Sequence, residues 1–174
     1  MGKCGGGRLT GRALELAYRY LGRRERTVGE VRQHLLSRAV DEVSAAAAID
    51  ELVEQGALDD ARFARLFLQD KRELEQWGSE RIRRGLVARG IDPELADAAL
   101  AAPGAAHARA AASGHAEEAP SELRRALGLL RQKFPQPLHG RRERERALGL
   151  LLRKGYEAEL ALDALRAHTE HQAA

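Results

Sequence analysis

The sequence predicts an all-α protein built from tandem repeats of three-helix units that form an elongated, curved array. Three observations lead to this fold class. Apolar residues recur at intervals of three and four along the 174 residues, which is the spacing of one helix face. Runs that alternate polar and apolar residues and are rich in Val, Ile and Thr, as strands are, do not occur. A basic, a small and an apolar residue follow one another at residues 38–40, 89–91 and 154–156, which indicates a repeat.

We expect repeat 1 at residues 9–58, after a flexible glycine-rich tail at residues 1–8. Apolar residues with helical spacing predict its first helix: Leu14, Ala17, Tyr18 and Leu21. Thr27 followed by Glu30 has the pattern of a capping box and predicts the start of a second helix. A third helix is expected over residues 41–56, with a buried face formed by Ile49, Leu52 and Val53.

Repeat 2 is expected at residues 59–102. The two aspartates at residues 59–60 favour a helix start. The buried face of that helix is predicted to contain Phe63, Leu66, Phe67 and Leu74. A Trp-Gly-Ser segment at residues 77–79 interrupts the helical pattern, and an Asp-Pro pair at residues 92–93 starts the last helix of the repeat.

An alanine-rich segment with two glycines and a proline follows, and we predict a linker at residues 103–120. Repeat 3 is expected at residues 121–174. Its first helix ends before Pro135, and its middle helix ends at Gly155.

The formal net charge of +3 conceals a strong alternation along the chain. Residues 1–40, 62–90 and 124–156 carry net positive charge, and the segments between and after them carry net negative charge. Helix ends account for part of this pattern, and solvated faces with i,i+4 pairs are the alternative for the rest. We predict a surface that contacts acidic protein or DNA phosphates. Its candidate residues are Arg62, Arg65, Arg81, Arg83, Arg84, Arg89, Arg141, Arg142, Arg144 and Arg146.

Motifs of catalysis are absent from the sequence, so we expect a protein that is not an enzyme and needs no cofactor. The pair Asp59 and Asp60 invites a general acid–base interpretation, but a capped helix start explains it better. His168 and His171 lack a third ligand, so we expect no metal. A single cysteine, Cys4, cannot form an internal disulfide. With no signal peptide or apolar span, the expected location is the cytoplasm, without membrane contact.

Several segments resemble one protein family. They are residues 57–64 (Ala-Leu-Asp-Asp-Ala-Arg-Phe-Ala), residues 78–86 (Gly-Ser-Glu-Arg-Ile-Arg-Arg-Gly-Leu), residues 88–91 (Ala-Arg-Gly-Ile) and residues 152–156 (Leu-Arg-Lys-Gly-Tyr). In these segments the sequence is similar to the RecX regulatory proteins of bacteria. The resemblance covers residues 11–165 apart from the linker. One departure is Ala39, at a position where the family usually has glycine.

The resemblance implies tandem three-helix repeats and a role as a modulator, mainly an inhibitor, of the RecA recombinase. Members of the family are expected to bind RecA or its filament on single-stranded DNA. They lower ATP hydrolysis, filament growth and strand exchange, and so act in DNA repair, homologous recombination and the SOS response. We expect a monomer whose partners are RecA and its nucleoprotein filament, with direct contacts to DNA phosphates as a further expectation.

Two other functions remain open from the residues alone. A helix-turn-helix transcription regulator also uses three-helix units, although the middle helices contain few Asn, Gln or Ser residues to contact base edges. A direct single-strand binder needs aromatic residues for stacking, and only 4% of this chain is aromatic. Trp77 could stack on a base, but packing beside a helix break is the favoured interpretation.

Overall fold

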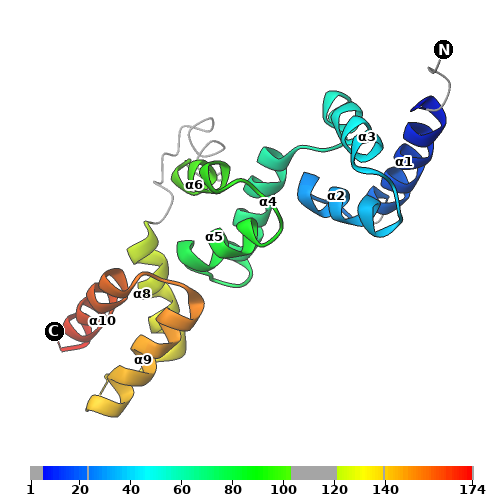
Figure 1. Ribbon diagram of the computed structural model, residues 1–174. Helices are drawn as coiled ribbons and strands as arrows, with labels where there is room; N and C mark the ends of the chain where they lie inside the picture. Colours follow the sequence, from blue (N-terminus) through cyan, green and yellow to red (C-terminus); the bar gives the residue numbers. More distant parts are fainter. Residues whose placement is uncertain (1–5, 23, 103–120, 139, 174) are drawn as a thin grey trace, which may run out of the picture. The chain divides into compact units, whose positions relative to one another are not determined.

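The computed structural model describes residues 6–22, 24–102, 121–138 and 140–173, and every regular element in these ranges is an α-helix. The predicted all-α fold of three-helix units is therefore confirmed (Figure 1). Helix α1 begins at Gly6, inside the segment predicted as a tail. The linker predicted at residues 103–120 and Cys4 lie outside the described residues.

The described helices fall in threes along the chain, and repeat 3 contains the last three. In chain order they are α1 (Gly6–Leu21), α2 (Val28–Ser37), α3 (Glu42–Glu54), α4 (Asp60–Glu73), α5 (Ser79–Val87), α6 (Pro93–Ala101), α8 (Glu122–Lys133), α9 (Arg141–Lys154) and α10 (Ala158–Ala173). Within the described ranges, no helix combines the length and the apolar character that a membrane span requires.

Contacts between residues divide the chain into two compact units. Compact unit 1 comprises Met1–Ala64 and Leu86–Ala96, and compact unit 2 comprises Arg65–Gly85 and Asp97–Ala174. In compact unit 1, helices α1, α2 and α3 pack against one another (Figure 1). The buried residues of this core are Ala13, Ala17, Val31, Leu35, Val40, Ala45, Ala48, Ile49, Leu52 and Leu58.

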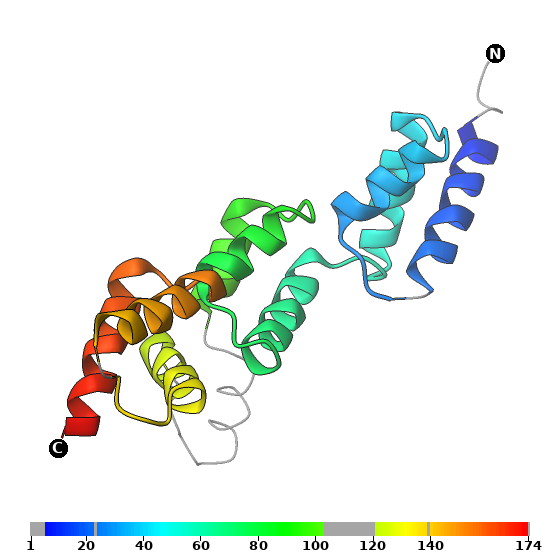
Figure 2. The same ribbon diagram turned by 90° about the horizontal axis from the view of Figure 1, so that it is seen from below.

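The core of compact unit 2 lies among α8, α9 and α10, where α10 packs against both other helices (Figure 2). Its buried residues are Ala126, Leu129, Leu130, Ala147, Leu151, Tyr156, Ala161, Ala164 and Leu165. Burial of such apolar side chains contributes about 25 cal/mol per Å² of apolar surface to the free energy of folding.

Local sequence signals set the helix ends. The hydroxyl of Thr27 accepts a hydrogen bond from the backbone N–H of Glu30, whose carboxylate accepts from the N–H of Thr27, so the predicted capping box is confirmed. Asp41 caps α3 through the N–H of Ser44. Gly155 ends α9 with φ +86°, a conformation that glycine adopts without steric cost.

Three of the apolar residues predicted to be buried are exposed instead: Val53, Leu66 and Leu74. Small residues occupy the buried positions of α1, whereas the buried face of α4 combines one alanine with Leu68. Ala13, Ala17 and Ala64 are fully buried. Leu74 is 80% exposed because α4 already ends at Glu73, so the helical spacing no longer applies.

Candidate functional site

The N-terminus of α2 packs against the turn between α5 and α6 within compact unit 1. A Cβ built on either Gly29 or Gly90 would lie 2.9 Å from the Cα of the other glycine. Gly90 has φ +83°, which residues with a Cβ rarely adopt. The buried hydroxyl of Thr27 donates a hydrogen bond of 2.5 Å to the backbone carbonyl of Arg89. The glycines therefore permit a close approach that the threonine holds in place.

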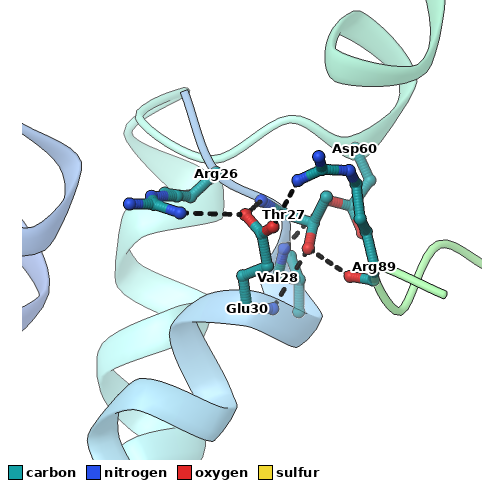
Figure 3. A network of polar contacts seen from close by, with 6 residues as sticks. All are labelled: Arg26, Thr27, Val28, Glu30, Asp60 and Arg89. Carbon is teal, nitrogen blue, oxygen red and sulfur yellow. Dashed lines mark hydrogen bonds and ion pairs between the residues drawn. The ribbon is translucent and has the colours of Figure 1, made fainter. Parts of the chain in front are cut away.

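Charged residues surround this junction (Figure 3). The carboxylate of Glu30 binds the guanidinium of Arg89 at 2.7 Å and lies 3.8 Å from that of Arg26. Asp60 accepts a hydrogen bond of 2.9 Å from the backbone N–H of Val28. Burial raises the pKa of Asp60, and the neighbouring negative charges add to this effect, although the hydrogen bond from Val28 opposes it.

A second junction of the same kind lies within compact unit 2, where the N-terminus of α5 meets the turn after α9. The backbone N–H of Gly78 donates to the carbonyl of Lys154 at 2.8 Å, and that of Glu80 donates to the carbonyl of Gly155 at 3.2 Å. A Cβ on Gly155 would lie 2.6 Å from the backbone nitrogen of Arg81. Glycine is therefore required at this turn for its conformation and for the space it leaves.

The two junctions use equivalent positions of the sequence repeat. Thr27 and Gly78 are 51 residues apart, and the carbonyls that accept their hydrogen bonds, those of Arg89 and Lys154, are 65 residues apart. The same turn in repeat 1 carries Ala39, with φ +58°. Thus each middle helix of repeats 1 and 2 begins against the basic–glycine–apolar turn of the repeat that follows.

Two half-buried arginines add positive charge beside the second junction. Glu122 accepts hydrogen bonds of 2.7 Å from both the backbone N–H and the hydroxyl of Ser79. Burial lowers the pKa of Arg72, and the positive charge of Arg125 lowers it further, whereas Glu122 acts in the opposite direction. Burial likewise raises the pKa of the Tyr156 hydroxyl. Glu122 therefore both caps α5 and offsets positive charge.

The structure places several of the ten predicted arginines in contacts with the protein itself. Arg83 binds Asp97 with two hydrogen bonds of 2.6 and 3.1 Å. Arg62 lies 3.4 Å from the carboxylate of Glu25. Arg89 belongs to the first junction, as its bond to Glu30 shows. The charge of these residues is already balanced within the fold.

Other predicted arginines are exposed and point their charge outward. Arg141 pairs with Glu145, one turn further along α9, and its side chain remains 91% exposed. The rest of this exposed set consists of Arg65, Arg84, Arg142, Arg144 and Arg146. Within the described ranges, no acidic side chain forms an ion pair with these five.

Three residues outside the predicted set complete a basic hollow on compact unit 2. An open depression is lined by Trp77, Arg81, Arg84, Gly85 and Arg153. The guanidinium of Arg81 lies 4.1 Å from the centre of the Trp77 ring and donates a hydrogen bond of 3.0 Å to the backbone carbonyl of Arg153. Trp77 stands out in the sequence as the single tryptophan, but no local sequence signal places it beside Arg153.

Metal-ligating and paired acidic residues have other surroundings in the part of the chain that the structure describes. No group of three His, Cys, Asp or Glu residues there could hold a metal ion. Asp59 accepts a hydrogen bond from the backbone N–H of Arg62 at 2.8 Å, and Asp60 binds Val28. Both carboxylates therefore serve helix starts, as the sequence favoured.

Comparisons with protein families match two segments of the chain. Residues 13–52 match the model of the first three-helix domain of RecX, and residues 59–100 match that of the second three-helix domain. The "Regulatory protein RecX" of Leptothrix cholodnii is 30% identical over 164 residues, which cover 94% of this chain and 91% of the relative. That of Xanthomonas axonopodis pv. citri is 33% identical over 144 residues, covering 83% and 80%.

A relative from Lactobacillus delbrueckii subsp. bulgaricus is 40% identical over 90 residues, but the match spans only 33% of that longer protein and 52% of this chain. Among solved structures, the crystal structure of RecX from Lactobacillus salivarius has a TM-score of 0.72 at 18% identity, covering 93% of this chain and 97% of that one. A second crystal structure, of a regulatory protein RecX, has a TM-score of 0.61 at 24% identity, covering 87% and 69%. At 18% and 24% identity, these two similarities show a shared fold.

Proposed function

The chain belongs to the RecX family of regulatory proteins, and from this premise we propose that it is a non-enzymatic regulator of the RecA recombinase. It binds RecA or the filament that RecA forms on single-stranded DNA. By binding, it lowers ATP hydrolysis, filament growth and strand exchange, and so acts in DNA repair, homologous recombination and the SOS response. Family membership over most of the chain is the observation that carries this proposal.

The exposed arginines supply the contact surface in this proposal. Guanidinium groups bind carboxylates and phosphates in a bidentate manner, so the same surface suits acidic protein patches and a DNA backbone. Exposed arginines occur on α4, α5 and α9, which gives several separate contacts to one filament. Several weak contacts on one chain strengthen binding through effective concentration. In the same proposal the protein is a monomer that acts in the cytoplasm.

The test is the DNA-dependent ATP hydrolysis of the cognate recombinase, measured with and without this protein. We expect the wild-type chain to lower the rate. The double variant Arg142→Glu/Arg146→Glu should need about tenfold more protein for half inhibition, which corresponds to about 1.4 kcal/mol of lost binding. An unchanged rate with wild-type protein would overturn the regulatory role.

The matched control is Arg19→Glu/Arg166→Glu. Both arginines are exposed, and each pairs with a carboxylate of its own helix, that of Glu15 or Asp163. The control reverses the same amount of charge at other places, so equal inhibition by both double variants would refute the assignment of α9 but not the function. Gel shifts on random duplexes test the transcription-regulator alternative, which requires sequence preference that persists at about 0.2 M salt.

A further inference from the structure

The basic depression on compact unit 2 has the composition of an anion site. We name it the Trp77 hollow and define it by its lining residues, Trp77, Arg81, Arg84, Gly85 and Arg153. Three of these five are arginines, and none is acidic. A second depression on the same unit contains Glu145 beside Arg141 and Arg144, so part of its positive charge is balanced.

Arg81 is held in one position at the wall of the Trp77 hollow. Its guanidinium lies over the Trp77 ring at 4.1 Å, a favourable cation–π distance. One amino group, Nη1, donates to the carbonyl of Arg153, while the described residues provide no hydrogen-bond partner for its remaining N–H groups. The ring of Trp77 is itself packed edge-on against Phe67, with 6.4 Å between the ring centres. A ligand therefore meets a guanidinium whose conformational entropy is already lost.

Arg84 and Arg153 approach the hollow from α5 and α9, and both are exposed. Arg84 forms only a long hydrogen bond of 3.3 Å, from Nε to the backbone carbonyl of Glu80. A nearby carboxylate, that of Glu75, is paired with Lys71 and also interacts with the charge of Arg81. Among the described residues, Arg84 and Arg153 form no ion pair, so their positive charge is available to an anion from outside.

Gly85 lets the aromatic side chains beside the hollow pack closely against α5. Glycine inside a helix costs about 1 kcal/mol relative to alanine, so its presence within α5 calls for a reason. A Cβ at this position would lie 3.2 Å from the Phe67 ring and 3.8 Å from the Trp77 ring. Without that atom, the rings of Phe67 and Trp77 can lie close to α5, beside the arginines of the hollow.

We propose that the Trp77 hollow binds a phosphate group, supplied by a nucleic-acid strand or by a free nucleotide. A phosphate is tetrahedral and presents oxygens in several planes, so guanidiniums arriving from two helices can all bind it. A carboxylate offers its oxygens in one plane and satisfies fewer such donors. The assignment of a nucleic-acid strand as the source in the cell rests on the proposed function.

The only tryptophan of the chain lies in the hollow, so its intrinsic fluorescence reports directly on binding. The full chain is titrated with inorganic phosphate, with dTMP, with thymidine, with an oligo(dT) strand and with a glutamate peptide of equal charge. We expect saturable fluorescence changes with the phosphate-bearing ligands and none with thymidine. Calorimetry repeats each titration, so that binding without a fluorescence change is also detected. Saturation by dTMP alone assigns the source to free nucleotides, and saturation by oligo(dT) assigns it to a strand.

The variant Arg84→Gln/Arg153→Gln removes two of the three guanidiniums and should weaken oligo(dT) or dTMP binding at least about tenfold. For a strand, the slope of log affinity against log salt should fall by about 0.7 for each phosphate that the variant no longer binds. The control Arg19→Gln/Arg166→Gln loses the same charge elsewhere and should bind as the wild type does. Thermal unfolding verifies that both variants are folded.

Three outcomes overturn the phosphate site: no binding of any phosphate-bearing ligand, equal or tighter binding of the glutamate peptide, and equal affinity of the two double variants. The assay contains no recombinase, so its failure is distinct from a failure of the proposed function. Saturable binding together with unchanged ATP hydrolysis by RecA would retain the hollow and refute the regulatory role.

Discussion

Gly29 and Gly90, which are 61 residues apart in sequence, lie in backbone contact at the start of α2, where neither position has room for a Cβ. The contact joins repeat 1 to the turn of repeat 2 inside compact unit 1. Because backbone atoms of both partners form it, no rotamer change can make space for a side chain. This contact in compact unit 1 therefore requires glycine at both positions.

Replacement of Gly90 by alanine should lower the free energy of unfolding by about 3 kcal/mol, since it adds steric overlap to an unfavourable positive φ. Gly56 is the matched control. It has φ +69°, but a Cβ added there would meet nothing within 4 Å, so Gly56→Ala should cost only about 1 kcal/mol. Urea denaturation of both variants measures the difference. Equal losses would show that the contact with Gly29 contributes nothing.

Thr27→Val should cost about 2–3 kcal/mol, because the hydroxyl both caps α2 and satisfies the carbonyl of Arg89 in a buried position. Ser121→Ala removes a cap of α8 that is exposed and makes a single bond of 3.3 Å, to the N–H of Arg124. This control should cost about 1 kcal/mol. Chemical denaturation gives both values, and a Thr27→Val loss no larger than the control would contradict the prediction.

Asp60→Asn should stabilise the protein near pH 7. The pKa of Asp60 is raised in the folded state by burial, so the folded protein binds its proton more tightly than the unfolded chain does. The stabilising contribution of the protonated form is fully present below the ordinary pKa of 3.8 and is lost as pH rises through the folded pKa. Asparagine keeps the oxygen that accepts from Val28 but has no charge. Its advantage at pH 7 should disappear towards pH 3.

Asp41→Asn should change the stability at pH 7 in the opposite direction and serves as a comparison. The hydrogen bond from the backbone N–H of Ser44 lowers the pKa of Asp41. The ionised form is therefore favoured in the folded state, and this stability is lost as pH falls through the folded pKa. The variant should be less stable than wild type at pH 7. Unfolding midpoints of both variants are measured at pH 7 and at pH 3. If the two substitutions changed the stability at pH 7 in the same direction, the assignments would be refuted.

Glu122→Ala should lower the free energy of unfolding by about 2 kcal/mol. The substitution removes the acceptor of both Ser79 hydrogen bonds and leaves Arg72 and Arg125 without the carboxylate that offsets their charge. Glu122→Gln, which retains an acceptor oxygen, should lose less. Thermal unfolding compares the variants, and identical midpoints for Ala and Gln would exclude a role for the hydrogen bonds.

Helix boundaries were predictable from the sequence because the signals that set them are local. The capping box at Thr27, the Asp-Pro start at residues 92–93 and the left-handed glycine at Gly155 each act within a few residues of the boundary. The recurrence of the basic–small–apolar turn is also visible in the sequence, and it indicates the repeats.

Tertiary partners decide what the sequence could not predict. Arg83 and Arg84 are neighbours on α5, yet one binds Asp97 and the other lines the Trp77 hollow. Nothing within a turn of either residue distinguishes them. The exposed Leu66 is a related case, because the buried face of α4 contains Ala64 and Leu68, and the small side chain of Ala64 is a weak apolar signal.

Ala39 gives repeat 1 a property that its two successors lack. Gly90 and Gly155 each admit the backbone of a preceding helix, whereas the methyl group of Ala39 occupies the corresponding space in a turn with φ +58°. The turn at Ala39 therefore cannot receive the start of a helix as closely as the turns at Gly90 and Gly155 do. One methyl group thus distinguishes the turn of repeat 1 from the two turns that take part in junctions.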